Sequence, residues 1–341
     1  MTSAKTKPAP LYDHLARMSD ARGLFEHALY STPRPEHGYC VDDVARGLVV
    51  VCREPQPTPV LKRLERCYLD FVLGAAAADG SCHNRMNADG TWSDTAGLGD
   101  WWGRALWGLG VATTHARTSG MRARALGGFR ILAQQRAPHV RAMAFAALGA
   151  AEVRTTRPDE RCAQQLLADA VHAVCPGELD PVWPWPEARL SYGNGTLAEA
   201  VIVAGASLGH AQIINRGLAM LGFLLRTETS AGHLSVTPVA GRGPRDLKPG
   251  FDQQPIEVAA LADACAAAYR VSEDPRWLTG IRMSWDWFLG DNDSSTPMFD
   301  TATGAGFDGL ESGGCNQNQG AESTLAMLST AQHARSISQL R

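Results

Sequence analysis

Six helix-length segments constrain the fold of this 341-residue sequence more than any other feature. Each is rich in Ala, Gly, Leu and Val and is almost free of charge after its first turn. A helix that is apolar on nearly all sides is buried on most of its faces, and small residues let it approach its neighbours closely. The six segments span residues 42–52, 103–114, 139–153, 195–208, 255–269 and 320–333.

Amphipathic segments alternate with the apolar ones along the chain. Within residues 60–76, for example, Lys62 and Arg66 lie on one side of a helix and Leu64 and Tyr68 on the other. This pattern is typical of helices that face water on one side and protein on the other. The amphipathic segments span residues 19–30, 60–76, 120–135, 159–174, 210–226 and 274–290.

The sixfold alternation predicts an all-α fold, an (α/α)6 toroid in which six outer helices surround six inner ones. We expect a single barrel domain over residues 18–341, a flexible lead-in over residues 1–17, and small β-ribbons at 81–92 and 233–238. An open α-solenoid and a pair of helical bundles are the alternatives. The uneven spacing of the segments argues against a solenoid of fixed period, and no Pro/Gly/Ser-rich linker separates two bundles.

Charge and composition exclude several classes of function. The 32 basic and 35 acidic residues give a formal net charge of -3, without a Lys/Arg cluster that would indicate binding to nucleic acid or to an anionic membrane. No apolar run approaches the ~20 residues of a transmembrane helix, and the first ten residues lack the apolar stretch of a signal peptide. The eight cysteines show no zinc-type spacing. We therefore expect a cytoplasmic protein with reduced thiols.

Sequence motifs for metals, cofactors and nucleophilic serines are absent as well. The sequence has no HExxH pattern, no His pair at helical spacing and no EF-hand spacing, and it has no G-x-S-x-G motif. No Gly-rich loop is placed between a strand and a helix in the way that nucleotide binding requires. We therefore expect no metal and no cofactor, and the oligomeric state stays open.

The loops that enter the apolar helices differ from those that leave them. The entering loops, at 37–43, 92–104, 180–195, 245–257 and 307–322, are long and rich in aromatic and amide residues, whereas the leaving loops are plainer. In a toroid all inner helices point the same way, so their N-terminal loops gather at one mouth. Because binding and catalysis concentrate on loops held by a rigid scaffold, we expect the functional site at that mouth.

Aromatic, amide and charged residues are concentrated in and beside these entering loops. Flat aromatic faces stack against the C–H groups of sugar rings, and amide side chains both donate and accept hydrogen bonds, which suits hydroxyl recognition. Pro184 and Pro186 keep Trp183 and Trp185 in an extended stretch that displays its side chains. We therefore predict that the mouth binds a carbohydrate. The candidate substrate-binding residues are Tyr39, Asp42, Arg46, Asp100, Trp101, Trp102, Arg104, His139, Trp183, Trp185, Tyr192, Asn194, Gln253, Gln254, Glu257, Asn316, Gln317, Asn318 and Glu322.

Acidic residues at the mouth indicate glycoside cleavage, in which one carboxyl group protonates the leaving oxygen and an ionised one activates water or attacks. Glu187, next to Trp185 and two prolines, is the candidate for an apolar pocket that retains the proton. Asp43, at a helix start beside Arg46, is expected to stay ionised, and Asp252 is the substitute for either role. Helix capping is the alternative explanation for each acid in a first turn.

Five segments spread over nearly the whole chain are distinctive in combination. They are GYCVDDVARGL (38–48), GRALWGLG (103–110), WPWPEARLSYGNGTLAEA (183–200), FDQQPIEVAALADA (251–264) and NQNQGAESTLAML (316–328). In these segments the sequence resembles the six-hairpin glycosidase superfamily and, more narrowly, bacterial (α/α)6 proteins encoded near glycosyltransferases and mannoside phosphorylases. The resemblance implies the toroid, a sugar-binding mouth and usually inverting hydrolysis by a pair of acidic residues.

Two further functions fit the same fold. N-acylglucosamine 2-epimerases and cellobiose epimerases share the toroid and use histidine pairs on inner helices as acid and base, whereas here only His139 stands at the start of an inner helix. A non-catalytic carbohydrate-binding partner of a glycosyltransferase is the other alternative. We expect a glycoside hydrolase that acts on an oligosaccharide. The sugar, its linkage and the stereochemistry of cleavage stay open.

Overall fold

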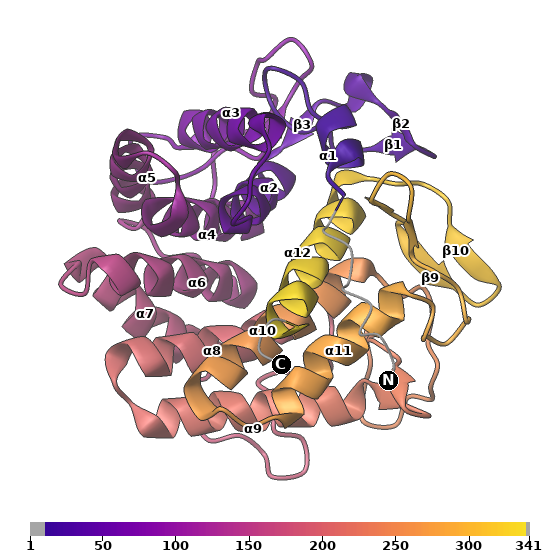
Figure 1. Cartoon of the computed structure of the whole chain (residues 1–341). Coiled ribbons are helices and arrows are strands. Elements are labelled where there is room, and N and C mark those ends of the chain that lie inside the picture. The colour runs from indigo at the N-terminus through magenta and orange to yellow at the C-terminus, as the bar shows by residue number, and fades with distance from the viewer. Residues whose placement is uncertain (1–10, 339–341) are drawn as a thin grey trace.

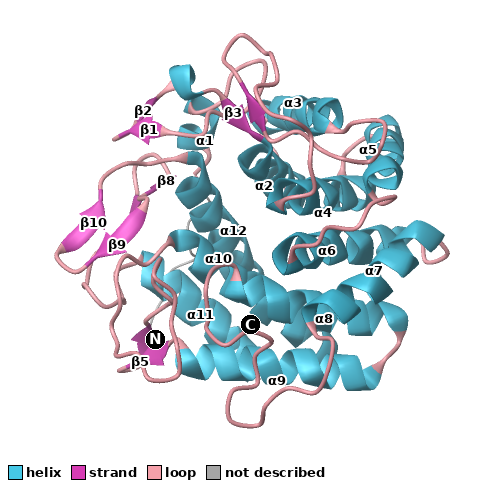
Figure 2. Cartoon of the chain, turned by 180° about the vertical axis from the view of Figure 1, so that it is seen from behind, coloured by secondary structure: helices cyan, strands magenta, loops and turns pink. Residues whose placement is uncertain are grey.

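The computed structural model describes residues 11–338, and helices dominate that part of the chain (Figure 1). Six helices form an inner layer: α2 (Val41–Arg53), α4 (Asp100–His115), α6 (Val140–Thr156), α8 (Asn194–Leu208), α10 (Pro255–Ser272) and α12 (Ala321–Ser338). Five long helices pack outside them: α3 (Pro59–Ala75), α5 (Ser119–Leu132), α7 (Arg161–Val174), α9 (Ala211–Thr227) and α11 (Arg276–Phe288). Figure 2 shows the same two layers from behind.

The inner helices form a closed ring. Each contacts the next one along the chain, and α12 contacts α2 again. Each long outer helix packs against the inner helix that precedes it. All six apolar segments of the sequence form inner helices, so the predicted all-α (α/α)6 toroid is confirmed.

The predicted outer helix over residues 19–30 is wrong. This segment contains turns, bends and a short strand, and a five-residue helix, α1 (Asp13–Arg17), contacts α12 and α3 instead. The local reason is the side chain of Asp20, which accepts hydrogen bonds from the backbone N–H groups of Arg22 and Gly23 at 2.8 and 3.0 Å. Such a side-chain-to-backbone turn competes with helix formation.

The flexible lead-in is also wrong for the part of it that the structure describes. Residues 1–10 lie outside the described residues, but α1 packs onto the barrel, and its His14 is buried with Nε2 lying 2.8 Å from the carbonyl oxygen of Gln319. Just before α1, the Tyr12 hydroxyl donates a hydrogen bond to Glu54 at 2.6 Å. These contacts join the start of the described chain to the residue that follows α2 and to the loop before α12.

Short antiparallel β-ribbons and one 3₁₀ turn (Pro35–His37) lie in the long loops. The strand pairs are β1 (Ala28–Leu29) with β2 (Thr32–Pro33), β3 (Tyr39–Cys40) with β4 (Arg85–Met86), β5 (Thr229–Ser230) with β6 (His233–Leu234), β7 (Phe299–Asp300) with β8 (Ala305–Gly306), and β9 (Gly309–Glu311) with β10 (Gly314–Asn316). In the ribbon predicted at 81–92, Met86 pairs with Trp92 inside the segment, and β4 also pairs with β3 outside it. In the ribbon predicted at 233–238, β6 pairs with β5, which lies outside the segment. The ribbons β1–β2 and β9–β10 lie on the same side of the molecule, beside α12 (Figure 1).

Glycines bring α4 and α6 close together. A β-carbon placed on Gly149 of α6 would lie 2.1 Å from the carbonyl oxygen of Leu106, and one on Gly103 of α4 would lie 2.2 Å from that of Ala142. Only a residue without a side chain fits such a crossing. The two helices therefore hold the residues at their N-terminal ends at a fixed separation.

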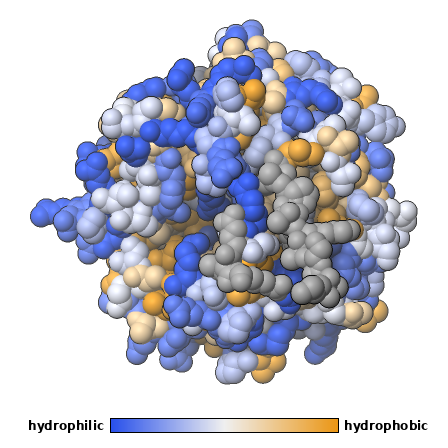
Figure 3. All heavy atoms as spheres, in the orientation of Figure 1, coloured by the Kyte–Doolittle hydropathy of each residue, from blue (hydrophilic) through white to orange (hydrophobic). Residues whose placement is uncertain are grey.

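The face of the molecule in Figure 3 is largely hydrophilic, with apolar residues scattered between the charged ones. Within residues 11–338, no helix has both the length and the apolar character that a bilayer crossing requires. The eight cysteines are free thiols.

Candidate active site

Two adjoining basins lie at the mouth where the inner helices begin. We call the larger one, of about 1100 Å³, the Arg141 basin, and the smaller one, of about 370 Å³, the Arg46 basin. The Arg141 basin is lined by Asp42, Asn84, Asp100, Trp101, Arg104, His139, Arg141, Glu187 and Tyr192, among others. The Arg46 basin is lined by Glu26, His27, Cys40, Asp42, Asp43, Arg46, Arg85, Arg104, Gln254, Asp308 and Glu322, among others. All six inner helices, or the loops directly before them, contribute to this mouth.

The guanidinium group of Arg46 joins two carboxyl groups in the smaller basin. Its Nη2 donates a hydrogen bond to Asp43 at 2.6 Å, and its Nη1 donates one to Glu322 at 2.8 Å. The two carboxyl groups are therefore held by the same guanidinium group. They differ in environment, because the Asp43 side chain is only 4% exposed whereas that of Glu322 is 41% exposed.

Burial raises the pKa of Asp43 to about 7, although the charge of Arg46 opposes this shift. The expectation that Asp43 stays ionised beside Arg46 is therefore wrong. The physical reason is that the free-energy penalty of removing the carboxylate from water exceeds its stabilisation by the one guanidinium group. Asp43 consequently exchanges a proton near neutral pH.

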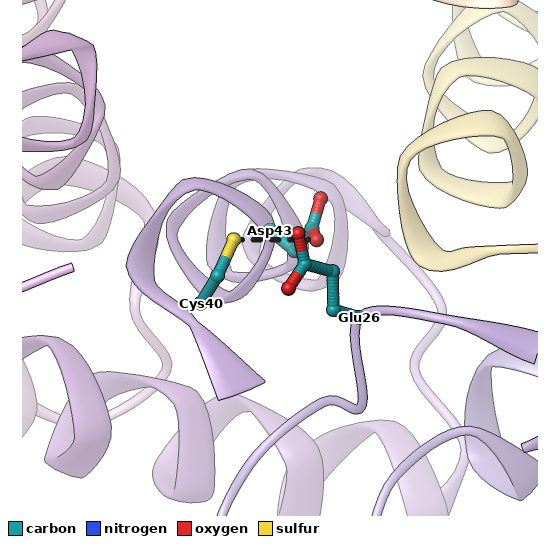
Figure 4. A group of neighbouring side chains, drawn as sticks. All are labelled: Glu26, Cys40 and Asp43. Atoms are coloured by element: carbon teal, nitrogen blue, oxygen red, sulfur yellow. Dashed lines mark hydrogen bonds between the residues drawn. The ribbon is translucent and has the colours of Figure 1, made fainter. Parts of the chain in front are cut away.

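Glu26 and Cys40 surround the other side of Asp43 (Figure 4). The ligand-type atoms of these three residues lie within 4.8 Å of one another, and the Cys40 thiol donates a hydrogen bond to Asp43 at 3.4 Å. Burial, reinforced by the charge of Asp43, raises the pKa of the Cys40 thiol well above its usual value, so the thiol keeps its proton. Arg85 pairs with Glu26, and Arg46 pairs with Asp43. Two guanidinium groups therefore supply the counter-charges of this cluster.

Asp42 and Arg104 connect the two basins, because both residues line each of them. Arg104 of α4 donates a hydrogen bond to Asp42 of α2 at 2.8 Å, and its guanidinium carbon lies 4.5 Å from the ring centre of Phe145. Asn84, from the loop next to β4, donates a further hydrogen bond to Asp42 at 3.3 Å. This arrangement fixes the floor between the basins.

Glu187 lies in a charged environment in the larger basin. Arg141 of α6 binds both of its carboxylate oxygens, at 2.9 and 2.8 Å, and stacks over the ring of Tyr192 at 4.4 Å. The predicted apolar pocket around Glu187 is therefore wrong, because the buried guanidinium of Arg141 takes Glu187 as its counter-charge. Asp252 does not fill the role of substitute acid, since it is exposed and lines neither basin.

The predicted aromatic residues divide between the basin and the core. Trp101 and Tyr192 line the Arg141 basin. Trp102 is fully buried and its indole N–H donates to backbone carbonyl groups, while Tyr39 is buried with its hydroxyl bound to Asp20. Trp183 and Trp185 pack against Phe223 of α9 and line neither basin. The loop that contains Pro184 and Pro186 therefore points both indole rings toward the protein. The two tryptophans are not available to stack on a sugar in either basin.

Several of the polar loop residues that were predicted to bind substrate instead form hydrogen bonds with other groups of the protein. Glu257 is buried and accepts hydrogen bonds from the backbone of Gly193 and from Asn194, which ties α10 to the start of α8. Gln253 is buried and donates to Asp293. The amide run Asn316, Gln317 and Asn318 lines neither basin, and Asn318 accepts a hydrogen bond from the backbone of Tyr30.

The predicted residues that do line the basins are Asp42, Asp43, Arg46, Asp100, Trp101, Arg104, His139, Glu187, Tyr192, Gln254 and Glu322. Arg141, in the first turn of α6, was not among the residues predicted from the sequence, although Arg46 and Arg104, also near the start of an apolar inner segment, were. Asn84 and Glu26 were missed because they stand in irregular segments without a helical or strand period.

No protein-family profile matches the sequence, and no curated protein matches it. Solved structures match over nearly the whole chain. A sugar epimerase from a ruminal bacterium has a TM-score of 0.74 at 12% identity, with 95% of each chain covered. A cellobiose 2-epimerase from Bacillus thermoamylovorans B4167 has a TM-score of 0.74 at 10% identity, over 97% of this chain and 96% of that one.

A GH76 α-mannanase from Bacteroides thetaiotaomicron has a TM-score of 0.67 at 10% identity, over 96% of this chain and 93% of that one. At identities this low, the similarity shows a shared fold only. The function of each protein has to be argued from the residues of its own site. These structures confirm the predicted architecture: this chain shares their (α/α)6 fold.

Proposed function

We propose that this chain is a carbohydrate-active enzyme, and specifically a glycoside hydrolase in which Asp43 is the acid and Glu322 the base. The observation that carries the proposal is the pair of carboxyl groups bound to the one guanidinium group of Arg46. Asp43 holds a proton near neutral pH, since its pKa is about 7, and Glu322 is open to the basin. Glycoside hydrolysis needs this division of roles between two carboxyl groups.

In the proposed reaction, Asp43 donates its proton to the glycosidic oxygen while Glu322 removes a proton from the attacking water. The bond from the anomeric carbon to the leaving oxygen breaks as the water oxygen bonds to that carbon. Glu322 then holds a proton and Asp43 has lost one, and exchange with solvent restores both groups. Arg46 donates to both carboxyl groups, so it stabilises the negative charge on whichever of them is ionised.

The Arg141 basin supports the binding of a substrate larger than one sugar. Its volume of about 1100 Å³ is at the upper end of small-molecule sites, which run to ~1,000 Å³. Trp101 and the half-exposed Tyr192 offer aromatic faces, and Asp100 and His139 offer polar partners. Because the two basins adjoin at Asp42 and Arg104, an oligosaccharide in the larger basin would extend toward Arg46.

The test is turnover of a panel of oligosaccharides and aryl glycosides by the wild type, Asp43→Asn and Glu322→Gln. We expect each variant to lose about 10²–10⁴-fold in kcat/KM, because proton transfer by a positioned side chain contributes that much. Asp252→Asn, which changes an exposed acid outside both basins, is the matched control and should keep wild-type turnover. Unchanged turnover in Asp43→Asn and Glu322→Gln would refute these roles, and a wild type that cleaves no glycoside would refute the hydrolase.

Sugar epimerisation is the second candidate, and the likeness to two epimerase structures favours it. His139, at the start of α6, lines the Arg141 basin and is the residue that would exchange the proton at C2 of a reducing sugar. Proton NMR in D₂O would show deuterium at C2 and the epimeric product, and His139→Ala would abolish both. Saccharide binding with neither reaction would favour the non-catalytic partner of a glycosyltransferase.

A further inference from the structure

A second hollow lies at the opposite end of the barrel, where the inner helices end. It consists of two adjoining cavities of about 570 and 370 Å³, which we call together the basal cavity. Both parts are lined by Arg53, His115, Glu152, Glu199 and Arg270, from the C-terminal halves of α2, α4, α6 and α10 and from the middle of α8. Sites for small organic molecules have volumes of this order. The proposed hydrolysis uses none of these residues.

Glu199 of α8 distinguishes this cavity from an ordinary gap between helix ends. The residue is only 5% exposed, and within the part of the chain that the structure describes its carboxyl group has no hydrogen-bonding or ion-pairing partner. It lines both parts of the basal cavity and also a small cavity of about 50 Å³ between the inner helices. Most buried polar side chains have a partner, because burial without one costs free energy. The carboxyl group of Glu199 therefore indicates a ligand that donates hydrogen bonds into the cavity.

Asp263 of α10 is an acidic neighbour of Glu199 whose charge is already balanced. It accepts a hydrogen bond from Arg53 at 2.8 Å and lies 2.6 Å from Nε2 of His333 in α12. Burial alone would raise its pKa, but these two groups hold the pKa of Asp263 at about 2. Burial raises the pKa of Glu199 to about 8, and the charge of Asp263 adds to this shift. Asp263 is thus ionised and paired, whereas Glu199 keeps its proton near neutral pH.

Three other charged groups act on Glu199: Arg53 of α2 and Arg270 of α10 lower its pKa, and Glu152 of α6 raises it. Glu152 lies 3.2 Å from Nε2 of His115 in α4, so it too has a partner. Arg270 is exposed at the rim of the cavity. The inner helices present their carbonyl ends here, and the partial negative charge of those ends favours a cation.

We propose that the basal cavity binds a small molecule through a primary ammonium group, and that Glu199 is the carboxylate that receives it. The ammonium group donates a charge-assisted hydrogen bond to Glu199, which is stronger than a hydrogen bond between neutral groups. Glu199 loses its proton to solvent as the cation binds, so about one proton is released per ligand bound. Arg270 at the rim selects against a second positive charge at the far end of the ligand. This site is independent of the reaction proposed for the mouth.

Isothermal titration calorimetry of the full chain tests the proposal at pH 7. Glucosamine is the first probe, glucose is its uncharged counterpart, and ethanolamine is an ammonium compound without a sugar ring. Each titration is run in two buffers of different ionisation enthalpy, because the difference in heat counts the protons released. We expect both amines to bind and glucose to bind at least about tenfold more weakly to this site, since a charge-assisted hydrogen bond is lost.

Glu199→Gln keeps the shape of the side chain and should weaken amine binding by about tenfold or more, with no proton release. Glu178→Gln changes an exposed loop acid and should keep the wild-type affinity. The proposal is overturned if neither amine binds at millimolar concentration, if Glu199→Gln binds amines as well as the wild type, or if binding to the wild type releases no proton. Unfolding curves of both variants check that they are folded, and the proton count on the wild type needs no variant.

Discussion

Replacing Gly149 by Ala tests whether the glycine contact sets the spacing between α4 and α6. The new methyl group would lie 2.1 Å from the carbonyl oxygen of Leu106 and 2.9 Å from Cα of Trp107, whereas ordinary contacts begin at 3.4 Å. The helices must therefore separate by about 1 Å, because a packed interior has no free volume to absorb the methyl group. Overpacking of this kind costs ~1–3 kcal/mol, and the better helix propensity of Ala returns at most ~1 kcal/mol.

The expected result for Gly149→Ala is a net loss of about 1–2 kcal/mol in the free energy of unfolding, measured by urea titration with circular dichroism. Gly127→Ala in α5 is the matched control, since a β-carbon there meets nothing within 4 Å. That variant should gain about 0.5–1 kcal/mol from helix propensity alone. The reasoning fails if Gly149→Ala is as stable as the wild type, or if both substitutions shift stability in the same direction.

Three further predictions follow from single contacts. Glu65→Gln should lose about 3 kcal/mol in urea unfolding, because the buried carboxylate of Glu65 binds both the guanidinium and the backbone N–H of Arg117. Thr58→Ala should lose about 1 kcal/mol, because the Thr58 hydroxyl caps α3 by accepting a hydrogen bond from the N–H of Leu61 at 3.3 Å. Asp43→Asn should become more stable relative to the wild type as the pH is raised from 5 to 8. The pKa of Asp43 is about 7 in the fold against an ordinary 3.8, so protonation favours folding at acid pH and that advantage disappears as the pH rises to about 7. Stability differences that do not change between these two pH values would contradict the assignment.

The ring of inner helices could be predicted from the composition of their segments alone. Small apolar residues run through the segments at 103–114 and 139–153 for three turns or more, and such helices are stable in water only when other helices cover most of their faces. The structure builds both as inner helices, α4 and α6. Local periodicity failed at residues 19–30, because the hydrogen bonds of the Asp20 side chain to its own turn are not visible in a hydrophobic pattern.

The long loops that enter the inner helices, rich in aromatic and amide residues, located the mouth in the sequence. The sequence did not distinguish Trp101, which lines the Arg141 basin, from its neighbour Trp102, which is fully buried. Successive helical residues point about 100° apart, so the direction of each side chain depends on how the helix is set against its neighbours. Only the tertiary structure determines this rotation of the helix relative to its neighbours.

The proton affinities were likewise decided by tertiary structure. Asp43 and Glu199 are both acids in apolar inner helices, Asp43 in the first turn of α2 and Glu199 in the middle of α8. Asp43 meets Arg46 and Cys40, whereas Glu199 meets the charge of Asp263 and no partner of its own among the described residues. Which charges approach a buried carboxyl group depends on segments far apart in the chain. Local sequence therefore determined the helices and the end of the barrel that carries the mouth, while packing between distant helices determined which carboxyl groups keep a proton.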